Sequence, residues 1–212
     1  SLGDAIAVGV YAASYGLDSL AYVSNTNSVY SHAGLSAGMS IAASANNTNT
    51  GNAVVLNSAT GTINATGGIL AIGVSAHAND GDVTVTNAGA IHAQAYGSPG
   101  AVAIAVAMSG TAGTNTLNNL AGGVIQAYGA NTYAYAVTGD DGVDVINNAG
   151  TITGDVLTYA GDDKFNNLAG GIWNVAGTMQ TDFGDDDDSL SNSGTIWITN
   201  GSIGFGNGDD TA

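Results

Sequence analysis

Four corners of the chain carry paired aspartates, a residue type that can do acid–base chemistry or bind a hard cation. The pairs are Asp140 and Asp141, Asp162 and Asp163, Asp185 and Asp186 (the start of a run of four), and Asp209 and Asp210. Two carboxylates at a set separation are what glycoside hydrolysis requires. Stacked carboxylate oxygens also suit Ca²⁺, which takes about six to eight oxygen ligands. A third interpretation is structural, because Asp caps backbone N–H groups in turns.

The repetition of the pair favours the structural role, because no single unit stands out from its neighbours as an active site should. Lys164 is the only Lys or Arg of the chain, which disfavours a polysaccharide lyase that uses such a residue to take a proton. A carbohydrate-active β-helix enzyme that uses Asp alone remains an alternative. The nearest calcium solenoid motif is the tandem nonapeptide GGxGxDxUx, and this chain has no tandem nonapeptides. A calcium-stabilised spacer is the other alternative, and no further cofactor is expected.

The charge of the chain narrows the class of partner. Its 212 residues include 17 Asp and one Lys, for a net charge of −16. Nucleic acids and anionic membranes are bound through clustered Lys and Arg, so neither is expected as a partner. No stretch reaches the length of a transmembrane helix, and the absence of Cys rules out a disulfide framework. Asp without Glu, together with 33 Gly, indicates many turns and short strands rather than helices.

Two series of short motifs repeat along the chain in a constant order, and this repetition predicts the architecture. GDD corners begin at Gly139, Gly161, Gly184 and Gly208, at spacings of 22, 23 and 24 residues. The second series is an Asn followed by Gly and a β-branched residue. Its members are Asn57, Asn87, Asn119, Asn148, Asn167 and Asn192. Stacked amides hydrogen-bond from coil to coil and Asn tolerates a left-handed backbone, so we expect an Asn ladder at a tight turn.

Each unit holds about three short strands, which bury an apolar face only when copies stack. Residues 1–212 are therefore expected to form one all-β segment, a parallel β-helix of about eight three-strand coils. The coils are long to about residue 139 and short over 139–212. An inward ladder is expected from the residues two places before the repeated Asn: Ile146, Phe165 and Leu190. A second inward position after the turn is expected to hold Ile152, Ile172 and Ile196.

Trp173 and Trp197 follow the repeated Ile in successive short units, GGIWNV and GTIWIT. Because side chains alternate along a strand, both are expected opposite the inward Ile and therefore outside. Two stacked exposed tryptophans would form an apolar strip that could contact a sugar or a protein.

The phrases GDDKFNNLAGGI and GDDDDSLSNSGTI resemble the repeats in passenger domains of bacterial autotransporters. The resemblance is clearest over residues 139–210 and looser over 57–138, where the Asn-Gly-Ile element persists. It implies a right-handed β-helix, a handedness that the bias of parallel crossovers also favours. It further implies export through the outer membrane by a C-terminal β-barrel, and a chain cut from a longer passenger.

Passengers of this kind are large surface or secreted proteins, some of which carry a serine protease domain. The GDSGS-like nucleophile motif of such a domain is absent from this chain. The resemblance therefore implies a non-enzymatic structural or adhesin segment at the bacterial cell surface, with a role in virulence. Its expected partner is a protein or glycan on a host or neighbouring cell, or a second copy of itself. Direct membrane insertion by this segment is not expected.

Overall fold

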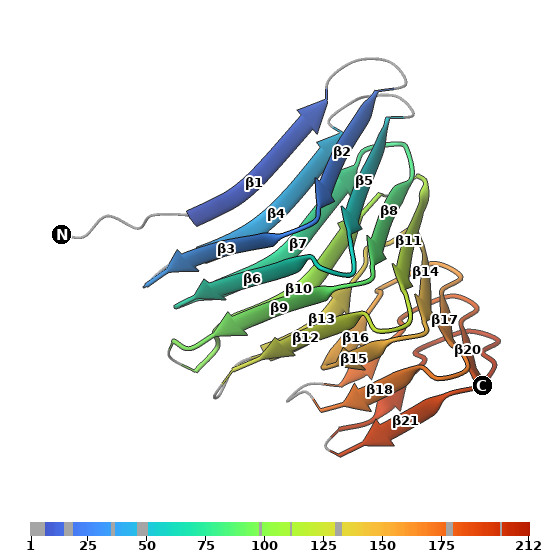
Figure 1. Ribbon diagram of the computed structural model, residues 1–212. Coiled ribbons are helices and arrows are strands. Elements are labelled where there is room, and N and C mark those ends of the chain that lie inside the picture. Colours follow the sequence, from blue (N-terminus) through green and yellow to red (C-terminus); the bar gives the residue numbers. More distant parts are fainter. Residues whose placement is uncertain are drawn as a thin grey trace.

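The chain winds short strands about one axis, with its two termini at opposite ends of the stack (Figure 1). The computed structural model describes residues 7–14, 19–34, 37–45, 51–97, 99–110, 112–129, 133–176, 180–199 and 201–212. Within these residues the regular structure consists of strands alone. The expected all-β class is therefore confirmed.

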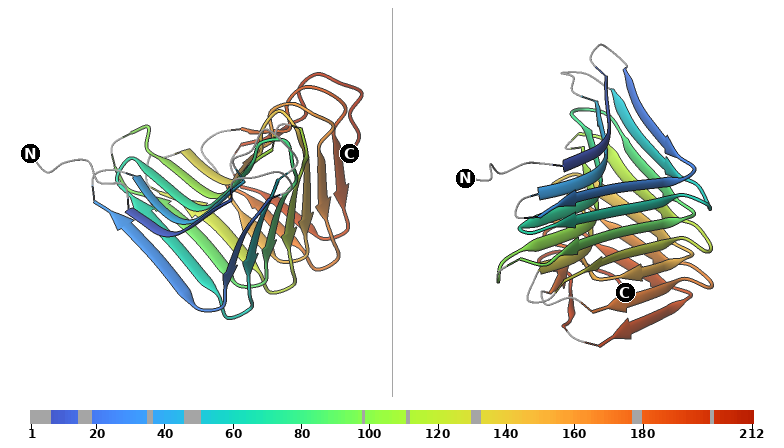
Figure 2. Two further views of the ribbon diagram at one scale, coloured as in Figure 1. Left: turned by 90° about the horizontal axis from the view of Figure 1, so that it is seen from above. Right: turned by 60° about the vertical axis from the view of Figure 1, so that its left-hand side comes forward.

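The strands form three parallel sheets around a common interior, as the views in Figure 2 show. Sheet A contains β1 (Ala7–Ser14), β4 (Ala37–Ala45), β7 (Leu70–Ala78), β10 (Val102–Ser109), β13 (Tyr133–Thr138), β16 (Asp155–Leu157), β19 (Thr181–Asp182) and β22 (Ile203–Gly204). Sheet B contains β2 (Leu20–Asn25), β5 (Asn52–Asn57), β8 (Val83–Asn87), β11 (Thr114–Asn119), β14 (Val143–Asn148), β17 (Lys164–Asn167) and β20 (Ser189–Asn192). Sheet C contains β3 (Ser28–Ala33), β6 (Thr62–Gly67), β9 (Ala90–Ala95), β12 (Val124–Tyr128), β15 (Thr151–Thr153), β18 (Ile172–Val175) and β21 (Thr195–Ile198).

Consecutive strands enter sheets A, B and C in turn, so each strand pairs with the strand three places later in the chain. This order defines a parallel β-helix, as the repeats predicted. The expected number of eight coils is wrong, because the described strands make seven complete coils and only β22 of an eighth. The count is lower because the early coils are long: the coil from Asn25 to Asn57, for example, takes 32 residues.

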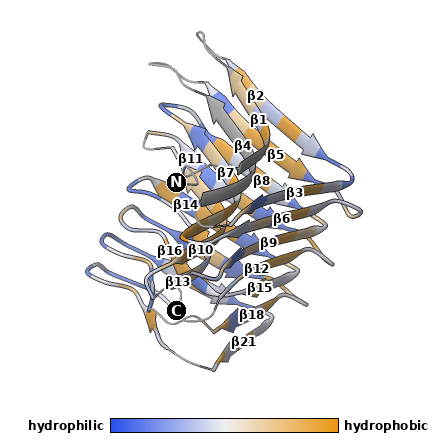
Figure 3. Cartoon of the chain, turned by 90° about the vertical axis from the view of Figure 1, so that its left-hand side faces the viewer, coloured by the Kyte–Doolittle hydropathy of each residue, from blue (hydrophilic) through white to orange (hydrophobic). Residues whose placement is uncertain are grey.

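Alternation of side chains builds the core, with every second residue of a typical strand buried (β8, for example). Figure 3 shows the same alternation as orange and blue bands along the strands. In the early coils the buried residues are mainly Ala, Val and Ile. In the late coils sheet A shrinks to strands of two or three residues, and large rings fill the interior: Phe165, Trp173 and Phe183.

The register of the late coils corrects one expected column. Ile146, Phe165 and Leu190 are partners in successive coils, as the repeats predicted. Ile172, however, pairs with Thr151 and points outward, whereas Trp173 pairs with Ile152 and with Ile196. Ile172 follows Gly171 directly, whereas Ile152 and Ile196 stand two residues after Gly150 and Gly194. Aligning the three Ile residues with one another therefore misplaces this strand by one residue.

Gly184 provides a test of the close approach between coils. Its φ is 108°, and a Cβ added there would overlap the carbonyl oxygen of Tyr159 in the preceding coil. Gly170 has a φ of 85° but open space where its Cβ would lie. We expect Gly184→Ala to lower the free energy of unfolding by about 3 kcal/mol or more, and Gly170→Ala by about 1 kcal/mol from backbone strain alone. Urea unfolding followed by far-UV circular dichroism measures both, and equal midpoints would contradict the close contact.

Candidate functional site

Three inward positions in each late coil, on a strand of sheet B or directly before it, carry the chemistry of the interior. They follow the pattern Asp, any residue, an apolar residue, any residue, Asn, so that strand alternation turns all three side chains inward. β14 provides Asp144, Ile146 and Asn148 in this way. The corresponding residues of the next two coils are Asp163, Phe165 and Asn167, then Asp188, Leu190 and Asn192. The interior therefore holds an acidic column and an amide column, separated by an apolar one.

The amide column is a continuous hydrogen-bonded ladder. The Nδ2 of each Asn donates to the Oδ1 of the next at 2.8 or 2.9 Å, along Asn25, Asn57, Asn87, Asn119, Asn148, Asn167 and Asn192. Asn25 was missed by sequence reasoning because no Gly follows it closely. Its Val-x-Asn spacing matches that of Val55 and Asn57, and was the signal that could have found it. The expected left-handed backbone is wrong, since the described non-Gly residues with positive φ are Tyr159 and Asp186.

The acidic column is built by bonds from backbone to carboxylate. The backbone N–H of Asp144 donates to Asp163 Oδ1 at 2.7 Å, and that of Asp163 donates to Asp188 Oδ1 at 2.9 Å. The N–H of Asp188 donates in turn to Asp210 Oδ1 at 2.9 Å. Asn115 occupies the same column one coil before Asp144. Each carboxylate thus closes the corner of the coil before it.

Sequence reasoning missed Asp144, which has no acidic neighbour directly before or after it. The signal that identifies it is a constant spacing of four residues from the acid to the ladder Asn, seen in Asp144 to Asn148 and in Asp163 to Asn167. The register also shifts the predicted corners. Gly161 lies against Gly142, so the GDD at Gly139 is not its equivalent.

The predicted pairs Asp162–Asp163 and Asp209–Asp210 do not act as pairs, because one member points into the stack and the other points out, whereas Asp185 and Asp186 are both exposed. Asp163 is buried, whereas Asp162 is exposed and accepts a bond from the N–H of Asp187 at 3.2 Å. Asp210 is likewise half-buried beside the exposed Asp209. Adjacent residues of an extended strand face opposite sides, so the two carboxylates of a corner do not converge on a common ligand.

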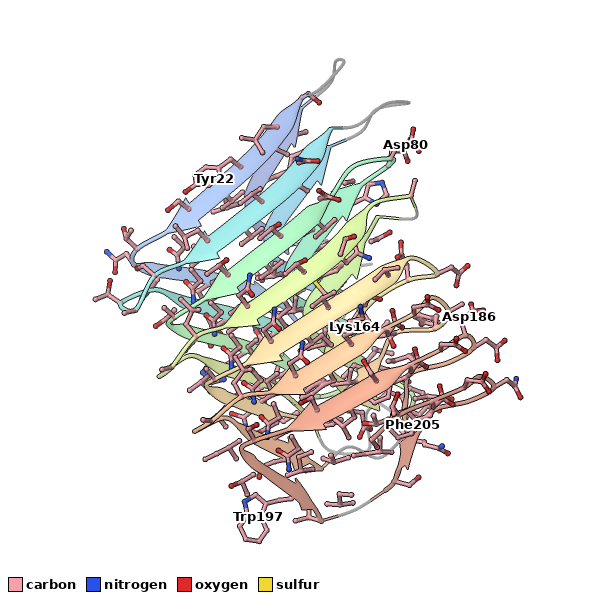
Figure 4. All side chains as sticks on the ribbon, turned by 90° about the vertical axis from the view of Figure 1, so that its right-hand side faces the viewer. Tyr22, Asp80, Lys164, Asp186, Trp197 and Phe205 are labelled. Atoms are coloured by element: carbon pink, nitrogen blue, oxygen red, sulfur yellow. The ribbon has the colours of Figure 1, made fainter. Side chains whose placement is uncertain are left out.

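The outward carboxylates gather where sheet A passes to sheet B. We call this the acidic edge, and its exposed residues are Asp80, Asp82, Asp141, Asp162, Asp185, Asp186, Asp187 and Asp209. The half-buried Asp140 lies beside them and accepts a bond from Asn115 Nδ2 at 2.9 Å. Figure 4 shows Asp80 and Asp186 at this edge. Among the described residues, no group of three or more His, Cys, Asp or Glu side chains is arranged to hold a metal ion. The calcium site expected at Asp140, Asp141, Asp162, Asp163, Asp185, Asp186, Asp209 and Asp210 stays a prediction.

Inside the stack, one oxygen of each column carboxylate lacks a hydrogen-bond partner: Asp144 Oδ1, Asp163 Oδ2 and Asp188 Oδ2. Burial raises the pKa of Asp144 to about 8, and the neighbouring carboxylate of Asp163 adds to this rise. Burial also raises the pKa of Asp163 to about 7 and that of Asp188 to about 6. Lys164 is exposed on the outer face of β17 and so does not enter the column (Figure 4). Protons neutralise the column at mildly acidic pH.

A pocket of about 340 Å³ lies beside the acidic edge in the last coils. Asp182 and Asp185 line it, together with Leu157, Tyr159, Gly184, Gly206 and Asn207. Asp185 Oδ1 accepts a bond from Asn207 Nδ2 at 2.6 Å, and Asp182 Oδ1 has no hydrogen-bond partner. Two carboxylates therefore border this pocket.

The two tryptophans do not form a strip. Trp173 is 0% exposed, its ring stacks on Phe165 with centroids 4.2 Å apart, and its Nε1 donates to the carbonyl oxygen of Gly154 at 3.2 Å. Trp197 is 59% exposed and points into solvent (Figure 4). The register pairs Trp173 with Ile196 and Trp197 with Asn174, so the two rings are one residue out of step. The expectation that both lie outside is wrong for Trp173.

Comparison with known proteins yields no match: no family model, no curated protein and no solved structure matches this chain. Within the described part of the chain, no helix has the length and apolar character needed to cross a membrane. The candidate site is therefore interpreted from its geometry alone.

The contrast between the two tryptophans gives a direct test of the register. Trp173→Ala removes a buried ring and its hydrogen bond, so we expect the free energy of unfolding to fall by about 3–5 kcal/mol. Trp197→Ala is the matched control and should change it by less than about 0.5 kcal/mol. Tryptophan fluorescence adds a second readout, because the blue-shifted emission of a buried indole should be lost with Trp173 alone. Similar destabilisation by both changes would refute the register.

The acidic column predicts stability that falls as pH rises. A carboxyl group whose pKa is higher in the folded state than its usual value near 4 contributes its full stabilisation at acid pH. This stabilisation is lost as the pH rises through the pKa of the folded state. From pH 4 to 8 we therefore expect stability to decline, with a slope of up to about 1.4 kcal/mol per pH unit for each such carboxyl. Asp144→Asn should flatten the slope and raise stability at pH 8, since Asn115 already fits the same column. Urea midpoints from pH 4.5 to 8.5 measure the effect.

Asp162→Asn is the control for this series, because it removes a carboxylate that is adjacent to Asp163 in the chain but faces solvent. It should leave the slope nearly as steep as in the unaltered chain. If Asp144→Asn and Asp162→Asn flatten the slope of stability against pH equally, or if stability rises with pH, the acidic column is not the source of the pH dependence.

Proposed function

We propose that this chain is a non-enzymatic segment of an exported surface protein, and that it displays lateral contact surfaces on a rigid solenoid. The observation that carries the proposal is the unbroken coil-to-coil bonding: three parallel sheets run in constant strand order, and an amide ladder joins all seven complete coils of the described chain. Such a scaffold resists bending, because each described coil is hydrogen-bonded to its neighbours in all three sheets.

The resemblance of residues 139–210 to autotransporter passenger repeats supports an extracellular, adhesin-like role at a bacterial surface. We infer a right-handed helix from that resemblance and from the bias of parallel crossovers. The composition is consistent with exposure to proteases, since trypsin-like enzymes find one Lys and no Arg. The partners that we propose are a protein or glycan on another cell, or a second copy of the chain, with neither nucleic acid nor membrane insertion involved.

The enzymatic alternative is a glycoside hydrolase acting in the pocket that Asp182 and Asp185 line. The repeated placement of Asp at every late corner favours the structural role over this one. The calcium-stabilised spacer is the other alternative, and the separation of the buried Asp163 from the exposed Asp162 counts against an ion shared by that pair.

Surface labelling of the cells that produce the protein tests the display role. Antibodies against the purified chain should label intact cells, and proteinase K added outside should remove the label. In parallel, the melting temperature of the purified chain should be unchanged by a chelator, and neutral oligosaccharides incubated with it should release no reducing ends.

Label that appears only after the cells are permeabilised would contradict the display role. A melting temperature that falls with chelator and returns with calcium would replace the proposal with the calcium-stabilised spacer. Release of reducing ends that disappears with Asp182→Asn or Asp185→Asn would replace it with the hydrolase.

A further inference from the structure

The outer face of sheet C is uncharged in a protein whose net charge is −16. All seven of its strands are described, and neither Asp nor Lys occurs on them. Partial burial lowers the pKa of His92 on this face, so its imidazole is neutral at pH 7. The acidic edge lies at a different corner of the coil, between sheets A and B. The face is therefore suited to a neutral ligand.

An open pocket of about 450 Å³ lies near the N-terminal end of this face, at the corners that lead from sheet C to sheet A. Ile69, Tyr96, Pro99 and Ala101 form its apolar lining, and the backbone of Gly34, Gly68, Gly97 and Gly100 forms the rest. Its volume falls in the range of small-molecule sites, about 300–1,000 Å³. Ile69 and Tyr96 keep a large part of their surface exposed, so the pocket is accessible to a ligand.

Three rings continue the pocket wall onto the sheet. Tyr96 Oη lies 2.8 Å from His32 Nδ1, and the same nitrogen lies 2.8 Å from Thr66 Oγ1. His32 stacks with Tyr30 at a centroid distance of 6.5 Å and an interplanar angle of 12°. Tyr30 is 63% exposed and Tyr96 43% exposed. Hydrogen bonds therefore hold Tyr96 and His32 in place, and Tyr30 stacks with His32, with ring surface left open to solvent.

A file of hydrogen-bonding side chains runs along the same face, one from each coil. Register places it in the order Tyr30, Asn64, His92, Gln126, Thr153, Asn174 and Trp197. Asn174 Nδ2 donates to Thr153 Oγ1 at 3.3 Å, and His92 bonds Gln126. Parallel coils stand about 4.8 Å apart, so these groups repeat at short, even intervals between two exposed aromatic residues.

This combination matches the chemistry of a sugar chain. A pyranose ring has an apolar C–H face that covers an aromatic ring and hydroxyl groups at its edge that bond amides, imidazoles and hydroxyls. Successive residues of an oligosaccharide present these groups at regular intervals, as the file does. An acidic glycan would be repelled by the net charge of −16.

We propose that the outer face of sheet C binds a neutral oligosaccharide, with one sugar ring in the pocket at Tyr96 and the next ones against His32 and Tyr30. This proposal rests on the proposed display role. It identifies sheet C as the displayed face and a neutral oligosaccharide as its ligand.

Isothermal titration of the purified chain tests the site directly. The probes are neutral hexasaccharides of glucose, mannose and N-acetylglucosamine, with hexagalacturonate as the anionic comparison. At least one neutral probe should bind saturably, and hexagalacturonate should not bind. Tyr96→Ala and Tyr30→Ala should each weaken that binding by about tenfold or more, as expected for an aromatic contact at the centre of a site. Tyr96→Phe keeps the ring and should retain most of the affinity.

Tyr22→Ala is the matched control, because Tyr22 is similarly exposed, at 49%, but lies on sheet B (Figure 4). It should leave binding unchanged, and circular dichroism should show that all four variants fold. Absence of binding by every neutral probe, equal losses at Tyr22 and Tyr96, or preferential binding of hexagalacturonate would overturn the assignment. Sedimentation velocity that shows self-association lost with Tyr96→Ala would assign the face to a second copy instead. The two proposals are tested separately. If intact cells are labelled, the display role holds whatever the titration shows, and a failure of labelling does not change the titration result.

Discussion

Coil-to-coil backbone hydrogen bonding is the constraint on which the rest of this structure depends. Parallel pairing places each residue beside its partner in the next coil, about 4.8 Å away. Side chains at one position therefore form a column, and a residue type repeated in the sequence must tolerate a copy of itself as its nearest neighbour. The interior is a set of such columns, and the chemistry of each follows from how well its side chain pairs with itself.

Asn and Asp show two outcomes of this constraint only four residues apart on the same strands. An amide has both a donor and an acceptor, so Asn148 accepts from Asn119 and donates to Asn167, and the ladder satisfies itself. A carboxylate only accepts, so Asp163 takes one bond from the backbone of Asp144 and is left with an oxygen that has no partner. Buried charge without a partner is costly, and a proton is the simplest remedy. We therefore expect the late coils to be more stable at acid pH than at alkaline pH.

The same constraint separates the outer surface into regions with different chemistry. Corners between sheets A and B repeat Asp and produce the acidic edge, while strands of sheet C repeat Thr, Asn, Gln and aromatic residues and produce a neutral face. A solenoid can therefore carry strong charge and still offer a flat, uncharged contact surface. A sequence with one Lys and no Arg, a scaffold bonded from coil to coil and a neutral face are all consistent with the proposed display role outside a cell.

The repeats alone determined the parallel β-helix, the amide ladder and the inward column of Ile146, Phe165 and Leu190. Each of these depends on the number of residues between repeated motifs, which the sequence gives directly. They did not determine the count of coils, since turn length varies. Trp173 was misplaced because Ile172 was aligned with Ile152 and Ile196, and a shift of one residue reverses the face of a strand. Tertiary structure alone decided that Asp163 lies inside while Asp162 lies outside, and that Tyr30, His32 and Tyr96 meet. Those outcomes depend on which residues of different coils become register partners, and coils that differ in length conceal this register in the linear sequence.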